Sequence, residues 1–197
     1  MSETRSYPRD VKTDAGDIEF RLMASADEAA VLDFARKLPT HDLLFLPRNI
    51  SQPKVLSAWV NEIERGQITS LLAVKGDAVV GCGTVVRDPY SWSPHVGEIR
   101  MVVSQDVRGQ GVGRALSQET FALALEGGLE KLSVQMTVDQ QAAIALFEGL
   151  GFKAEALLRD HVRDAAGQKH DIVVLGHNVA QVRAQMEAYG LPGAVQQ

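Results

Sequence analysis

The strongest constraint on the fold is the run from Arg108 to Arg114, which reads R-G-Q-G-V-G-R. It follows a stretch that predicts a buried strand, Glu98 to Val103, and it opens a stretch that predicts a helix, Gly113 to Glu126. Glycine has no Cβ, so the backbone can turn sharply there and approach a ligand closely. The first amides of a helix have no partner inside it, and the helix dipole adds partial positive charge at that end. The run therefore predicts a phosphate or pyrophosphate site.

Two common phosphate-binding patterns fit this run poorly. A nucleotide P-loop needs four residues between its glycines and then Lys followed by Ser or Thr, whereas Gly113 is followed by Arg114 and Ala115. A dinucleotide fingerprint reads G-x-G-x-x-G, whereas Gly109, Gly111 and Gly113 are evenly spaced. The spacing excludes the first pattern and disfavours the second.

A third pattern, R-x-x-G-x-G, is filled by Arg108, Gly111 and Gly113. It resembles the acetyl-CoA signature of the GCN5-related N-acetyltransferase superfamily, GNAT. Residues 140–152, QQAAIALFEGLGF, are similar to the next helix of that family, which commonly reads N-x-x-A-x-x-x-Y-x-x-x-G-F. The matching parts run from Ile18 to His177. The resemblance implies acetyl-CoA as co-substrate and direct transfer of its acetyl group to a primary amine.

Hydrophobic periodicity predicts the element order strand, helix, helix, three strands, helix, strand, helix and two strands. This order matches the GNAT fold, an α+β fold with a mixed, mostly antiparallel seven-stranded sheet and about four helices. We expect a flexible lead-in over residues 1–16, an acetyltransferase domain over 17–177 and a C-terminal helical extension over 178–197. That extension would pack on its own domain or form a dimer contact, so a homodimer is one expected assembly.

The resemblance also implies which residues hold the cofactor. Met101 and Val103 would contact the pantetheine arm through their backbone, and an amide near Met101 would serve the developing oxyanion. Gln140 stands where relatives often carry an asparagine that hydrogen-bonds the cofactor. The pyrophosphate would bind the amides of Arg108, Gly109, Gln110, Gly111, Val112, Gly113 and Arg114.

The amine must lose a proton before it attacks, and Glu98 is the candidate base. It lies five residues before Val103, whereas the usual offset in relatives is six, so its side chain either faces the wrong side of the sheet or needs a bulge. A structural carboxylate is the alternative role, and His95 is a weaker candidate base. Gln135 occupies another position used for the base and cannot accept a proton usefully. Phe147 replaces the tyrosine that many relatives use to protonate the leaving thiolate.

Composition narrows the remaining choices. The chain has 197 residues, 45% of them hydrophobic and 23% charged, which indicates one globular domain. Its start has no apolar core of a signal peptide and no apolar run approaches the length of a membrane span, so we expect a cytoplasmic protein without a membrane partner. A net charge of −5 argues against nucleic-acid binding. Cys82, the single cysteine, excludes an intrachain disulfide and a multi-cysteine metal site, and no metal is implied.

The acceptor stays open at this stage. We expect it to bind among three loops, Thr40 to Asn49, Asp88 to Pro94 and the turn carrying Asp160, His161 and Asp164, with Tyr90 and Trp92 as a candidate aromatic wall. Both a small amine and a peptide amine, at a terminus or on a lysine, fit the sequence. A CoA-binding regulatory module without turnover is the rival from another functional class.

Overall fold

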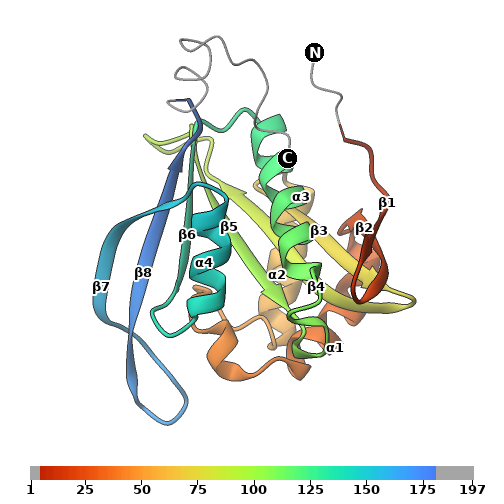
Figure 1. Cartoon of the computed structure of the whole chain (residues 1–197), viewed down its shortest axis with the longest axis horizontal. Helices are drawn as coiled ribbons and strands as arrows, with labels where there is room; N and C mark the ends of the chain where they lie inside the picture. Colours follow the sequence, from red (N-terminus) through yellow and green to blue (C-terminus); the bar gives the residue numbers. More distant parts are fainter. Residues whose placement is uncertain (1–4, 181–197) are drawn as a thin grey trace.

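The computed structural model describes residues 5–180 and contains one mixed sheet of 8 strands in the order β1-β2-β3-β4-β5-β6-β8-β7 (Figure 1). The strands are β1 Arg9–Thr13, β2 Gly16–Leu22, β3 Ile68–Lys75, β4 Ala78–Arg87, β5 Val96–Val103, β6 Lys131–Thr137, β7 Lys153–Arg163 and β8 Lys169–Asn178. Neighbouring strands are antiparallel, except that β5 and β6 run parallel. The predicted α+β fold class is confirmed.

Helices cover both faces of this sheet (Figure 1). The α-helices are α1 Glu28–Lys37, α2 Pro53–Glu64, α3 Val112–Glu126 and α4 Gln141–Gly149, and the short 3-10 helices are η1 Ser25–Asp27, η2 Thr40–Leu43 and η3 Gln105–Val107. Helices α1 and α2 pack on one face, where Phe34 and Leu56 share a core with Leu72. Helix α3 packs on the other face, beside α4, and Leu116 joins the core there. The predicted C-terminal extension falls largely at 181–197, outside the described residues.

The sheet has one strand more than the seven expected, because β1 lies in the segment predicted to be a flexible lead-in. It pairs with β2 through Val11 opposite Ile18. Before it, the Tyr7 hydroxyl donates to the buried carboxylate of Glu119 on α3 at 2.9 Å. The prediction was wrong for residues 9–13 because Val11 is the only strongly apolar residue of the strand, so the usual alternation is missing.

Close packing of α3 on β4 depends on Gly83. A Cβ added at this glycine would overlap the Thr120 side chain, and Leu116 lies just beyond it. Thr120 is fully buried, with its hydroxyl donated to the Leu116 carbonyl at 2.8 Å. The helix that follows the glycine run can therefore lie directly on the centre of the sheet.

We predict that Gly83→Ala lowers the free energy of unfolding by about 1–3 kcal/mol, since overpacking displaces α3 from β4. Gly149→Ala is the matched control, because no heavy atom lies within 4 Å of a Cβ added there. Urea unfolding of both variants measures the difference. An equal effect of the two substitutions would contradict the packing argument.

His177 on β8 is buried between aromatic rings. Its ring centroid lies 5.2 Å from that of Phe121 and 5.3 Å from that of Phe152. Burial lowers the pKa of His177 below its usual value, and a backbone hydrogen bond offsets this only in part. The folded protein therefore favours the neutral imidazole at this position.

From this we predict a pH-dependent stability. The unfolded chain binds a proton at His177 near its ordinary pKa of about 6.5, whereas the folded chain resists it, so the free energy of unfolding falls as pH drops below that value. His177→Phe should flatten this dependence in urea unfolding followed from neutral to mildly acidic pH. The same change at the exposed His161 should leave it as it is. An undiminished slope in the His177 variant would contradict the assignment.

Candidate active site

The parallel strands β5 and β6 pair only over part of their length. Their register runs from Val96 opposite Lys131 to Ile99 opposite Val134 and stops there. Both strands continue, to Val103 and Thr137, and their ends diverge. A cavity of about 560 Å³ opens in this cleft, and its walls come from both strand ends, the glycine run and α4.

Backbone groups of β5 face this cleft. The amide of Ser104 donates to the Val80 carbonyl on β4 at 2.8 Å. Polar groups alternate in direction along a strand, so those of Met101 and Val103 point away from β4 and into the cleft. The Arg108 guanidinium accordingly donates to the Val103 carbonyl at 2.9 and 3.2 Å. Met101 and Val103 both line the cavity, as a pantetheine-binding role requires.

The glycine run ends at the start of α3. Gly111 precedes the helix with φ of 82°, a left-handed conformation that favours glycine. The first helical hydrogen bond goes from the Ala115 amide to the Gly111 carbonyl at 3.0 Å. The amides of Val112, Gly113 and Arg114 come before it and have no partner in the helix. They form the N-terminal end at which an anion is favoured.

The residues of the run differ in what they present to the cavity. Five of the seven line it, namely Arg108, Gly109, Gly111, Gly113 and Arg114. The Gln110 side chain instead donates to the Asp106 carbonyl at 2.8 Å, and the Gln110 carbonyl accepts from the Asp14 amide at 3.1 Å. The Val112 side chain is fully buried in the core. Gln110 and Val112 therefore hold the loop and can offer a ligand only their backbone amides.

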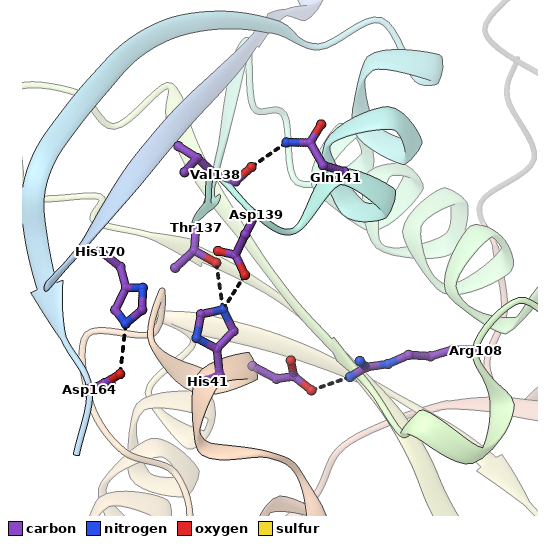
Figure 2. Close-up of polar contacts among 9 residues, drawn as sticks. His41, Arg108, Thr137, Val138, Asp139, Gln141, Asp164 and His170 are labelled. Carbon is purple, nitrogen blue, oxygen red and sulfur yellow. Dashed lines mark hydrogen bonds and ion pairs between the residues drawn. The ribbon is translucent and has the colours of Figure 1, made fainter. Parts of the chain in front are cut away.

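Helix η2 connects the two sides of the cleft through polar contacts of His41 and Asp42 (Figure 2). The Asp42 carboxylate lies 2.6 Å from the Arg108 guanidinium, and His41 Nε2 lies 2.7 Å from the Asp139 carboxylate. Arg108 precedes α3 and Asp139 follows β6, so these contacts span the cavity mouth. We call the His41–Asp139 and Asp42–Arg108 pairs the η2 clasp. Local sequence patterns do not reveal the η2 clasp, because its paired residues lie 98 and 66 residues apart.

Asp139 has an ionised carboxylate in this arrangement. Partial burial opposes ionisation, but hydrogen bonds with Thr137 and His41 outweigh it and lower the pKa of Asp139. Next to it, Gln140 directly precedes α4 and lines the cavity. Phe147 is buried, lines the same cavity and packs edge-on against Phe152 with ring centroids 5.3 Å apart.

Two of the three predicted acceptor loops meet beside the cleft. The His41 ring lies 5.1 Å from that of His170 at the start of β8, and His170 in turn contacts Asp164 at 3.0 Å (Figure 2). The third loop lies apart from both cavities. Tyr90 and Trp92 are almost wholly exposed there and line neither cavity. The prediction that they form an aromatic wall of the acceptor site is therefore wrong.

Glu98 lies on β5 where that strand still pairs with both neighbours. It is opposite Val86 on β4 and Ser133 on β6, and no bulge interrupts either register. Its carboxylate accepts two hydrogen bonds from Arg100, from Nε at 3.0 Å and from Nη2 at 2.7 Å. Glu98 lines neither cavity, and the exposed His95 lines neither as well.

A second cavity, of about 260 Å³, lies on the α2 face of the sheet. Trp59, Thr84 and Arg100 contribute to its wall. Met101 and Val102 line this cavity and the cleft alike, so the two spaces meet at the diverging end of β5. Cys82 at its floor is fully buried, and burial raises the pKa of that thiol to about 12.

Within 5–180, no helix is long and apolar enough to cross a membrane. In the same part of the chain, no group of three or more His, Cys, Asp or Glu side chains is arranged to hold a metal ion.

Known proteins share this fold. A putative acetyltransferase from Salmonella typhimurium, yncA, solved with its cofactor acetyl-CoA, superposes with a TM-score of 0.70 at 18% identity, covering 82% of this chain and 94% of that one. A ribosomal-protein-alanine N-acetyltransferase from Brucella melitensis gives 0.69 at 22% identity, covering 81% and 98%.

Curated sequences point the same way. The probable N-acetyltransferase family 8 member 5 of Mus musculus is 34% identical over 84 residues, 42% of this chain and 37% of the mouse protein, so the match spans well under half of that relative. N-alpha-acetyltransferase 30 of Schizosaccharomyces pombe is 23% identical over 108 residues, 54% of this chain and 72% of that protein. A profile of the acetyltransferase (GNAT) family matches residues 33–152, more than half of the sequence. The chain therefore belongs to the acetyltransferase (GNAT) family, as its two motifs predicted.

Proposed function

We propose that this chain is an acetyl-CoA-dependent N-acetyltransferase that acts on a primary amine. The observation that carries the proposal is the meeting of two cavities at Met101 and Val102. One cavity ends at a helix N-terminus suited to phosphate, and the other lies on the opposite face of the sheet with room for a small acceptor. Family membership supports the same enzyme class.

The residues of the cleft fit acetyl-CoA. The free amides at the start of α3, with Arg108 and Arg114, suit a pyrophosphate, and the backbone of Met101 and Val103 suits the amide-bearing pantetheine arm. When bound, acetyl-CoA supplies an activated acetyl thioester. A backbone N–H at the diverging end of β5 would donate to its carbonyl oxygen where negative charge develops.

The acceptor amine must be neutral to react. Its nitrogen then forms a bond to the acetyl carbon, the carbon–sulfur bond breaks with its electron pair leaving on sulfur, and the nitrogen loses a proton to a base. We keep Glu98 as the proposed base, acting through a relaying water while its carboxylate stays paired with Arg100. His41, oriented by Asp139, is the second candidate. Phe147 has no proton to give, and a thiol with a pKa of about 8.5 leaves tolerably as thiolate.

A CoA-binding module without turnover is the second candidate function. The Glu98–Arg100 pair favours it, because this contact engages the proposed base. Acetyl-CoA would then bind while no amine accelerates release of the thiol. The cytoplasmic location and the homodimer expected from the sequence stay predictions.

Gly111→Ala tests the proposed phosphate site at the N-terminus of α3. Gly111 and Gly128 both have left-handed backbones, φ 82° and 75°, and lie at opposite ends of α3. Alanine at either position should destabilise the fold by about 1 kcal/mol, because a Cβ strains this conformation. Only the Gly111 variant should bind acetyl-CoA more weakly in isothermal titration calorimetry. Equal affinity of the two variants for acetyl-CoA would contradict a phosphate site at the N-terminus of α3.

Glu98→Gln tests the base. We predict that kcat falls by about 100-fold or more, since general-base catalysis is lost, while the affinity for acetyl-CoA changes little. Thiol release followed across pH measures this, with His41→Gln as the comparison. If Glu98→Gln left the pH profile of kcat intact and His41→Gln abolished its acidic limb, the base would be His41.

A further inference from the structure

The charged side chains in the wall of the α2-face cavity are Arg48, Glu62 and Arg100. Glu62 already lies 3.2 Å from the Arg48 guanidinium, and both groups are partly exposed. Arg100 is the more enclosed cation, with its side chain 22% exposed. The wall itself therefore carries one more positive charge than negative, and the Glu98 carboxylate pairs with that charge from outside the cavity.

Arg100 has donor capacity left for a ligand. Its Nε and Nη2 are hydrogen-bonded to the two carboxylate oxygens of Glu98, which lies outside the cavity. Among residues 5–180, Nη1 has no hydrogen-bond partner. A guanidinium held flat by one carboxylate keeps its remaining N–H groups in a fixed direction, which suits a second planar anion.

Arg100 also lies next to the point where the two cavities meet. It directly precedes Met101 and Val102, the two residues shared by both cavities. Beta-strand alternation puts Arg100 on the same face as Val102, and thus on the acceptor side of the sheet. An anion bound by Arg100 would lie close to an amine placed where the two cavities meet. One small molecule could therefore carry both groups.

The rest of the wall is mostly apolar. Ile50 and Val55 line the cavity beside Trp59, whose indole N–H is already donated to the Ser70 hydroxyl at 3.1 Å. With its polar group satisfied, the Trp59 ring offers only an apolar surface. A volume of about 260 Å³ suits a single side chain and not an extended peptide.

We propose, on the basis of the function proposed above, that the acceptor is a free α-amino acid or a derivative of one, with an apolar side chain. Its α-amino group lies at Met101 and Val102, its α-carboxylate binds Arg100, and its side chain occupies the space beside Trp59. Arg100 is then the residue that determines specificity. The products are the N-acetyl amino acid and the CoA thiol, formed by the bond changes already described.

This assignment separates three kinds of amine. A peptide N-terminus has the same α-amino group, but its neighbouring carbonyl is neutral and gives Arg100 no ion pair. A polyamine would place a second cation against Arg100. A free amino acid has its amino and carboxylate groups on one carbon. This spacing matches Arg100 directly preceding Met101 and Val102, where the two cavities meet.

The test compares matched acceptors in a thiol-release assay with the full chain. L-phenylalanine, L-phenylalaninamide, phenethylamine and a peptide that begins with phenylalanine share one side chain and differ in the carboxylate. We expect kcat/KM for the free amino acid to exceed that of the other three by about tenfold or more, because a charge-assisted bidentate contact is lost in each of them. The leucine series repeats the comparison with an aliphatic side chain.

Arg100→Gln then isolates the carboxylate contact. The ratio of kcat/KM for phenylalanine to that for phenethylamine should fall close to one, chiefly through a higher KM for phenylalanine. This ratio is internal to each variant, so a general loss of folding or of Glu98 positioning cancels. Arg48→Gln is the matched control and should keep the preference, since Arg48 is largely exposed. Loss of the preference in Arg48→Gln alone would overturn the assignment to Arg100.

The remaining outcomes distinguish the two proposals. If the amide, amine or peptide were acetylated as well as the free amino acid, the acceptor class would be wrong while N-acetyltransferase activity stood. If acetyl-CoA bound but no amine, including polyamines and lysine peptides, released thiol, the proposed function itself would fail and this inference with it.

Discussion

The site depends on one interruption of backbone pairing, the divergence of β5 from β6 beyond Ile99 and Val134. Up to that point the two strands are ordinary parallel neighbours. Beyond it, the backbone of Met101 and the amide of Val103 have no neighbouring strand to bond and face the open cleft, while the Val103 carbonyl accepts from Arg108. A ligand that itself runs like a strand satisfies them. The cleft and its ligand are thus two consequences of the same gap in the sheet.

The fold fixes what lies at each end of this gap. Helix α3 connects β5 to β6 and rests closely on β4 because Gly83 leaves room for Thr120. Its N-terminus is therefore held beside the end of β5, with Gly111 making the turn. On the other face, α2 and the segment before it cover the second cavity. The η2 clasp ties that segment to Arg108 and Asp139, one on each side of the cleft.

Local signals predicted the parts of the structure that depend on neighbours in sequence. The glycine run, its strand and its helix stand where periodicity and turn chemistry indicated. Long-range contacts escaped such reasoning, namely the pairing of β1 and the contact of the Asp139 side chain with His41. The face of the sheet on which Glu98 lies could not be predicted from the sequence either. An offset of one residue along β5 moves a side chain to the other face, and only the register of β5 with β4 and β6 fixes that offset.

The measurement that tests this account most directly is amide hydrogen exchange, residue by residue, with and without acetyl-CoA. The account predicts that the amides of Met101 and Val103 and those at the start of α3 exchange freely in the isolated chain, because no group within residues 5–180 accepts from them. Added acetyl-CoA should slow all of them together. Protection confined to the α2-face cavity, with Met101 and Val103 unchanged, would contradict the claim that the divergence of β5 from β6 holds the cofactor.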